Sequence, residues 1–190
     1  MKKRNRAVIV TGFVGLKGTA VLAERFKEKI DSHYPMYLSR NAEHMADNVA
    51  EDCQSASEAI RKHMAQHSES DDLLLVEIGE GGFLTAMWTL AKAVGQGFTL
   101  DLRKVPVKQE TIEICELTEV NPYHLCSFGA VAAIVPDGLL LQEKLEELGI
   151  PSVIIGYTNS SKAHILMNDG TESHLNRPEP DELERLGINL

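Results

Sequence analysis

Apolar residues follow two periods along the chain, one typical of buried strands and the other of amphipathic helices. Two runs, at about 6–14 and at 130–135, are apolar at nearly every position, which predicts strands covered on both faces. A third run, 73–76, leads as a central strand into the glycine-rich stretch 79–82. Residues 98–103 alternate apolar and polar side chains, which predicts a strand with one solvent-facing side.

Helical spacing predicts the intervening helices. Phe83, Met87, Leu90, Ala91 and Val94 recur on one face directly after the glycine stretch, and this helix is expected to end at Gly95 and Gly97. The other predicted helices run from about Thr19 past Ile30, over 36–46, from a capping box at Ser55-x-x-Glu58 to Gln66, over 111–119, from Asn121-Pro122, and from Gly138 to Gly149.

The C-terminal part changes character. A short strand at 152–155 is followed by two strand-like segments, 163–167 and 171–175, around the turn Asn168-Asp169-Gly170, which predicts a hairpin. Residues 176–190 carry two prolines and many charges, and we expect them to form a surface tail. Interleaved strands and helices with a terminal hairpin predict a single α+β domain with a mixed sheet, rather than a purely parallel one.

Two glycine turns follow predicted strands and open predicted helices. Such turns direct backbone N–H groups toward the space before the helix, where the helix dipole favours negative charge. The alternative is that the glycines only allow tight packing. The candidate anion-binding residues are Glu77, Gly79, Glu80, Gly81 and Gly82 in one turn, and Thr11, Gly12, Gly15, Lys17, Gly18 and Thr19 in the other.

The charge balance limits the choice of partners. A net charge of −9 and a pI of about 5.3 do not fit a protein that binds nucleic acid through a basic face. The basic residues at 2–6 and the apolar run after them resemble a signal peptide, but Thr11, Gly12 and Gly15 interrupt that run. No segment approaches the roughly 20 apolar residues of a membrane span. We therefore expect a cytoplasmic protein without a membrane or nucleic-acid partner.

The residue types that bind metals are present without a complete ligand set. Cys53, Cys115 and Cys126 form no C-x-x-C pair, which indicates reduced thiols, the last two in the core. His63 and His67 are spaced as zinc ligands on a helix, but no third ligand accompanies them, and two solvated histidines are the simpler interpretation. We expect no metal site.

The order of these elements resembles the C-terminal domain of the aminoimidazole ribonucleotide (AIR) synthetase superfamily. This superfamily includes the hydrogenase-maturation carbamoyl dehydratase, selenophosphate synthetase and formylglycinamidine ribonucleotide synthetase. The likeness extends over about residues 7–175 and is greatest for AIR synthase-related proteins similar to the hydrogenase maturation factor. The segments that carry it are 10–20, Glu80-Gly81-Gly82 with Gly97-Phe98-Thr99-Leu100-Asp101, 105–116, Asn121-Pro122-Tyr123, Ser127-Phe128-Gly129 and Pro136-Asp137-Gly138.

The resemblance implies a three-layer α/β/α domain built on a mixed sheet. In the family an N-terminal domain precedes it, mediates dimerisation and supplies most nucleotide and magnesium ligands. About six residues precede the first predicted strand here, so we expect that domain to be absent and residues 1–175 to form one C-terminal-type domain.

Two departures from the family pattern affect the expected chemistry. The family has His or Asp, and Thr, just before the glycines, where this chain has Val76, Glu77 and Gly79. The C-terminal cysteine that accepts the carbamoyl group in the maturation factor is also absent, because the chain ends at 187–190 with Gly-Ile-Asn-Leu.

Two functional hypotheses remain. The first is a ligand-binding domain for ATP or another phosphate-bearing molecule, without independent catalysis, whose activity, if any, is ATP-dependent and needs a partner subunit. The second is a non-catalytic structural or regulatory module. It would form a homo-oligomer or pair with a partner protein that supplies the missing domain.

Overall fold

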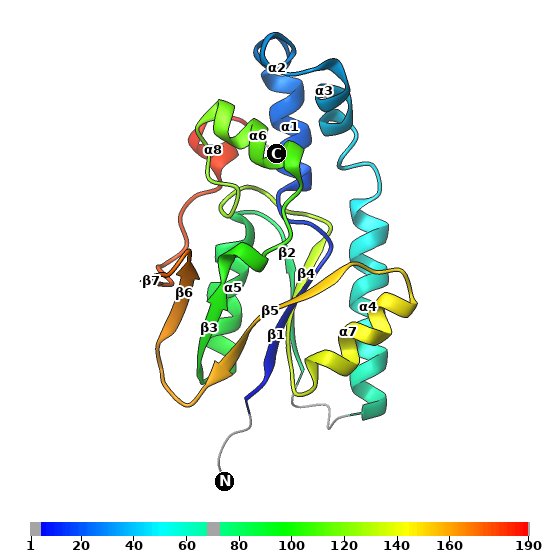
Figure 1. Ribbon diagram of the computed structural model, residues 1–190, viewed down its shortest axis with the longest axis vertical. Coiled ribbons are helices and arrows are strands. Elements are labelled where there is room, and N and C mark those ends of the chain that lie inside the picture. Colours follow the sequence, from blue (N-terminus) through cyan, green and yellow to red (C-terminus); the bar gives the residue numbers. More distant parts are fainter. Residues whose placement is uncertain (1–4, 68–72, 190) are drawn as a thin grey trace.

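A seven-stranded mixed sheet organises the fold (Figure 1). The computed structural model describes residues 5–67 and 73–189. The strand order is β2-β4-β1-β5-β3-β6-β7, with β3 and β6 parallel and all other neighbours antiparallel. The strands are β1 (Ala7–Thr11), β2 (Leu74–Ile78), β3 (Gly97–Asp101), β4 (Ala130–Val135), β5 (Ser152–Asn159), β6 (His164–Asn168) and β7 (Thr171–His174).

The helices form layers on both faces of this sheet and a group at one end of it (Figure 1). They are α1 (Leu16–Arg25), α2 (Lys27–His33), α3 (Met36–Glu43), α4 (Val49–His67), α5 (Gly82–Val94), α6 (Gln109–Thr118), α7 (Gly138–Glu147) and α8 (Glu182–Arg185), with a 3-10 turn at η2 (Leu102–Lys104). None of the helices in the described part of the chain is long and apolar enough to cross a membrane.

Alternating side chains of β1 explain why every residue of this strand is buried. Val8 and Val10 pack into the cluster under α5, whereas Ala7 and Ile9 pack under α4 and α7. Successive residues of a strand point to opposite faces, so a sheet between two helical layers needs apolar residues at both. The three-layer α+β class predicted from the sequence is confirmed.

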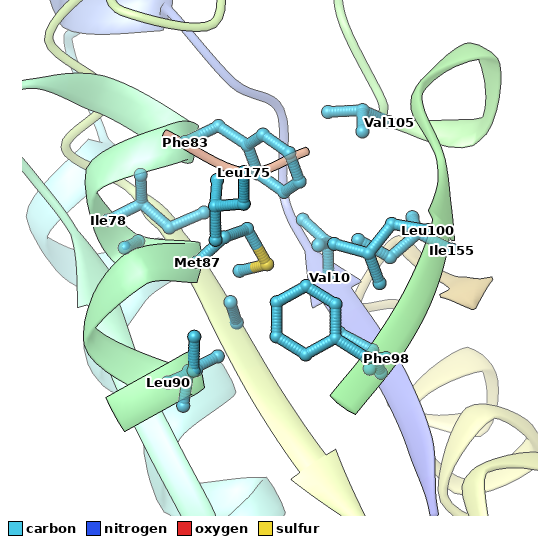
Figure 2. Close-up of a cluster of buried hydrophobic side chains, with 14 of the residues drawn as sticks. Val10, Ile78, Phe83, Met87, Leu90, Phe98, Leu100, Val105, Ile155 and Leu175 are labelled. Carbon is cyan, nitrogen blue, oxygen red and sulfur yellow. The ribbon is translucent and has the colours of Figure 1, made fainter. Parts of the chain in front are cut away.

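The apolar face of α5 fills the space over one face of the sheet. Figure 2 shows Phe83, Met87 and Leu90 pointing from this helix toward Val10 and Phe98 of the strands. Fully burying such a side chain contributes about 1.5–3 kcal/mol, so this helix–sheet contact is a main source of stability.

A third cluster lies at the end of the sheet, among α1, α2, α3 and α6. It contains residues from the C-terminal segment as well, because Leu183 of α8 is 1% exposed and packs there. The segment 176–190, expected as a surface tail, therefore includes buried side chains, since α8 closes over α6 and the start of α5.

Several predicted elements differ from the structure. The strand after the polar link 68–72 lies at an edge of the sheet and is not central; the link itself lies outside the described residues. Helix α4 begins at Val49, so the predicted capping box at Ser55 is wrong, and Ser55 lies inside the helix. Asn121-Pro122 starts a turn without a helix, in which the Asn121 side chain accepts a hydrogen bond from the Tyr123 N–H.

Candidate functional site

The two glycine turns meet at one end of the sheet. Strands β1 and β2 end there, and the antiparallel β4 between them begins there, directly after Gly129. A side chain at Gly12 would come within 2.8 Å of the Gly129 carbonyl oxygen, and one at Gly79 within 3.1 Å of the Phe128 ring. The structure thus places the two candidate turns on either side of a third glycine, which was not among the predicted site residues.

Position 129 requires a glycine because of its backbone conformation and because Val49 lies close to it. Its φ is +102°, and a side chain there would lie 2.7 Å from the Cβ of Val49, at the start of α4. L-residues rarely adopt this φ. The start of β4 and the start of α4 therefore approach each other closely, and this contact separates two cavities.

Several backbone N–H groups of the 12–19 turn, including those of its three glycines, already donate to acceptors within the chain. The Thr11 hydroxyl just before it is buried and has no hydrogen-bond partner among the described residues. The donors bind internal acceptors, namely Gly12 N–H to Pro151 O (3.0 Å), Gly15 N–H to Ser127 Oγ (2.8 Å), Gly18 N–H to Cys126 O (2.9 Å) and Thr19 N–H to Gly15 O (2.8 Å). From this turn, Lys17 is the residue that offers a side-chain charge to a ligand.

The glycine loop before α5 holds an anion that belongs to the protein. The Gly81 N–H donates to Asp181 Oδ2 at 2.7 Å, and the other carboxylate oxygen of Asp181 accepts from the Leu183 N–H at 3.0 Å. The Gly82 N–H donates to Gly79 O at 3.2 Å. A negative group at a helix N-terminus is what the dipole favours, but here it comes from the C-terminal segment.

The first cavity lies on the β1 side of Gly129 and has a volume of about 590 Å³. Val14 pairs with Val107 in a short parallel bridge, which brings Lys108 beside Phe13, and its Nζ lies 5.0 Å from the ring centre. Apolar side chains line part of the cavity, including Phe13, Leu16, Met45 and Ile150, and charged side chains line the rest, including Arg40, Asp52, Lys108 and Glu110.

The second cavity lies on the β2 side of Gly129 and has a volume of about 620 Å³. Two of the predicted site residues, Lys17 and Glu77, line it, while Gly79 to Gly82 line neither cavity. Lys17 and Glu77 are brought together with Cys53, Ser57, Glu58 and Arg61 of α4 and with the half-exposed ring of Phe128.

The thiols in and near this region are held neutral. Burial raises the pKa of Cys53, and the nearby carboxylate of Glu77 raises it further. Burial likewise raises the pKa of Cys115 and that of Cys126 to about 12. Because the thiolate is the reactive form, these groups are unsuited to nucleophilic attack near neutral pH. The predicted core position of Cys115 and Cys126 is confirmed.

Metal ligands do not gather at this site or elsewhere in residues 5–67 and 73–189, where no group of three His, Cys, Asp or Glu side chains could hold an ion. His63, expected to be solvated, is buried at 5% exposure because this side of α4 packs on the sheet.

The charged residues of the first cavity were missed by sequence reasoning. Arg40, His44 and Asp52 come from α3, the following loop and α4, whereas Lys108 and Glu110 lie at the start of α6. No spacing connects these segments along the chain, so only the folded arrangement reveals them.

Comparison with known proteins identifies the type of fold. No family model matches the chain. The carbamoyl dehydratase HypE of Rhizobium leguminosarum bv. viciae is 24% identical to it over 155 residues, 80% of this chain and 40% of that protein. The structure of E. coli HypE, a hydrogenase maturation protein, has a TM-score of 0.69 at 20% identity, over 95% of this chain and 52% of that one. The chain has the HypE fold. The predicted resemblance to the AIR synthetase superfamily is confirmed.

Two further HypE structures describe complexes. HypE bound to HypF has a TM-score of 0.66 at 23% identity, over 93% of this chain and 54% of that one. HypE bound to ATP has a TM-score of 0.64 at 18% identity, over 95% of this chain and 53% of that one. The chain thus spans about half of these solved proteins and less than half of the Rhizobium relative.

Proposed function

We propose that this chain is a HypE-like ligand-binding domain that takes a phosphate-bearing or nucleotide-like molecule at the two cavities around Gly129. A partner polypeptide would supply the half of HypE that the chain does not span. The observation that carries the proposal is the meeting of both glycine turns at Gly129, between cavities that carry Arg40, Lys108 and Lys17. A HypE protein that binds ATP supports the choice of ligand.

The side chains, more than the backbone, are the expected anion-binding groups. The backbone N–H groups of the glycine turns described above already donate to acceptors within the chain. The side chains of Arg40 and Lys108, in contrast, are exposed at the rim of the first cavity. Arg and Lys form charge-assisted hydrogen bonds to phosphate. The apolar surface beside Phe13 suits the base of a nucleotide.

We do not propose that this chain catalyses a reaction on its own. The Cys53 thiol at the second cavity is neutral, and the Gly81 N–H that could stabilise a developing negative charge is occupied by Asp181. A HypE protein forms a complex with HypF, which supports a role for this chain within an assembly.

Calorimetry with ATP, AMP and inorganic phosphate tests the ligand. We expect weak binding, with a Kd of about 0.1–1 mM for ATP. Replacing Lys108 or Arg40 by Ala removes one charge-assisted bond and should weaken binding about tenfold. The control is Lys104→Ala, which removes an exposed lysine outside the two cavities and should leave Kd unchanged.

If none of the three ligands gives a heat of binding at millimolar concentration, the proposed binding of a phosphate-bearing molecule is wrong. The assembly part is tested separately, by light scattering of the chain alone and mixed with the N-terminal half of a HypE protein. A monomer under both conditions would contradict it.

A further inference from the structure

Strand β2 forms one edge of the sheet and leaves its outer side unpaired. It pairs with β4 in a continuous antiparallel register from Leu74 to Ile78. Among residues 5–67 and 73–189, no backbone hydrogen bond reaches this strand from outside that ladder. About every second N–H and C=O group of the strand therefore points away from the sheet.

The outer edge of the sheet is apolar from Leu73 to Val76, and the exposed Glu77 follows. Leu74 and Val76 pack under α5, and Leu73 and Leu75 pack on the opposite face, so both faces of the strand have helical cover. All four side chains are nevertheless only partly buried, whereas every residue of the neighbouring strand β4 is fully buried. The remaining exposure therefore lies along the edge.

The other edge of the sheet is constructed differently. Strand β7 has the sequence Thr-Glu-Ser-His, and all four residues are exposed. Polar edges of this kind discourage strand addition, and so do prolines, lysines and bulges. Strand β2 contains no proline, lysine or bulge, and its one exposed residue is Glu77, so it is the edge better suited to accept another strand.

The charges near β2 distinguish between a second copy of this chain and a different polypeptide as the added strand. Glu77 and Glu80 are exposed at the end of β2, and Asp137 is exposed after β4, near the start of β2. A second copy of β2, paired antiparallel across a two-fold axis, would bring Glu77 and Glu80 of each chain toward Asp137 of the other. Like charges near each other across strands are unfavourable, and a net charge of −9 adds to this repulsion.

We propose that the outer edge of β2 binds an extended segment of a partner polypeptide as an added strand, with apolar residues flanked by lysine or arginine. Backbone hydrogen bonds to the open ladder provide affinity, and the apolar side chains continue the two layers under α5 and α4. The basic flanks complement Glu77, Glu80 and Asp137. Of these three residues, Glu77 also lines the second cavity, whereas Glu80 and Asp137 line neither cavity, so the added strand and the proposed ligand share one residue.

The test uses the whole chain and the synthetic peptide acetyl-Lys-Lys-Val-Ile-Val-Ile-Lys-Lys-amide. Hydrogen exchange of the 74–78 amides is followed by NMR at about 1 mM peptide. We expect exchange to slow about tenfold at alternate residues, those whose N–H groups point outward. Peptides with glutamate flanks should bind at least about fivefold more weakly, and peptides with alternate N-methylated amides should give no protection.

A charge-reversed variant and salt identify the electrostatic contribution. Glu77→Lys should reduce the difference between the lysine and glutamate peptides, and about 0.5 M salt should do the same in the unmodified chain. Unchanged exchange in β2 with the lysine peptide would overturn the proposal, and so would equal binding of the two charged peptides. A dimer that protects β2 without peptide would make a second copy the occupant and overturn the partner strand.

Discussion

Asp181 joins the glycine loop to the C-terminal segment through both of its carboxylate oxygens. One accepts from the N–H of Gly81, 100 residues earlier, and the other from the N–H of Leu183. At 7% exposure the carboxylate has little access to water, so these bonds compensate for its burial. A single side chain thus completes the N-terminus of α5 and the N-terminus of α8.

Replacing Asp181 by Ala should lower the free energy of unfolding by about 1–3 kcal/mol, because the buried Gly81 N–H loses its acceptor. Chemical denaturation measures this change. The matched control is Glu184→Ala, which alters an exposed carboxylate of the same short helix and should change stability by less than about 0.5 kcal/mol. Equal losses in both variants would contradict the assigned role of the Asp181–Gly81 bond.

At the level of elements, helix α6 shows how one backbone angle sets a boundary. Glu119 follows the helix with φ 57° and ψ 43°, and its N–H donates to carbonyl groups of the last turn. This left-handed conformation usually belongs to glycine. The helix therefore ends at a residue whose side chain opposes the required geometry.

Glu119→Gly should raise the free energy of unfolding by about 0.5–1 kcal/mol, because glycine adopts the left-handed conformation without the steric cost. Thermal and denaturant unfolding measure the change. The control in the same helix is Glu116→Gly, an exposed interior position that should lose about 1 kcal/mol. Destabilisation by both substitutions would show that the side chain of Glu119 matters more than its backbone.

Elements with strong local signals were predictable. Helix α5, the fully buried β4 and the β6–β7 hairpin lie where the patterns place them, because helical period, continuous apolarity and an Asn-Asp-Gly turn are encoded within a few residues. The start of α4 was not predictable from Ser55, because the same serine and glutamate spacing also occurs inside a helix.

On the scale of the whole molecule, the C-terminal segment belongs to the core. Leu183 packs with Ile114 of α6 and with Leu125 and Cys126 of the chain after it. The Glu182 carboxylate accepts a hydrogen bond from the Asn121 N–H at 3.0 Å, and the Arg185 guanidinium donates to Glu119 O at 2.8 Å. These contacts connect the last helix to the region around the glycine loop.

Leu183→Ala should therefore destabilise the protein by about 2–4 kcal/mol, through lost burial and the cavity left behind. The control is Leu139→Ala on α7, where the side chain is 65% exposed and its removal should cost little. Differential scanning calorimetry of both variants distinguishes a core position from a surface one. Similar melting temperatures for both variants would contradict the placement of α8 in the core.

The sequence by itself determined the α+β class, most strands and helices, and the two glycine turns, since each depends on residues that are close together in the chain. Tertiary structure decided that β2 is an edge, that Gly129 lies between the turns, that Asp181 occupies the Gly81 N–H, and that Arg40 and Lys108 share a cavity. These features join segments separated by tens of residues. Strand order and long-range packing establish them, and no local period encodes either.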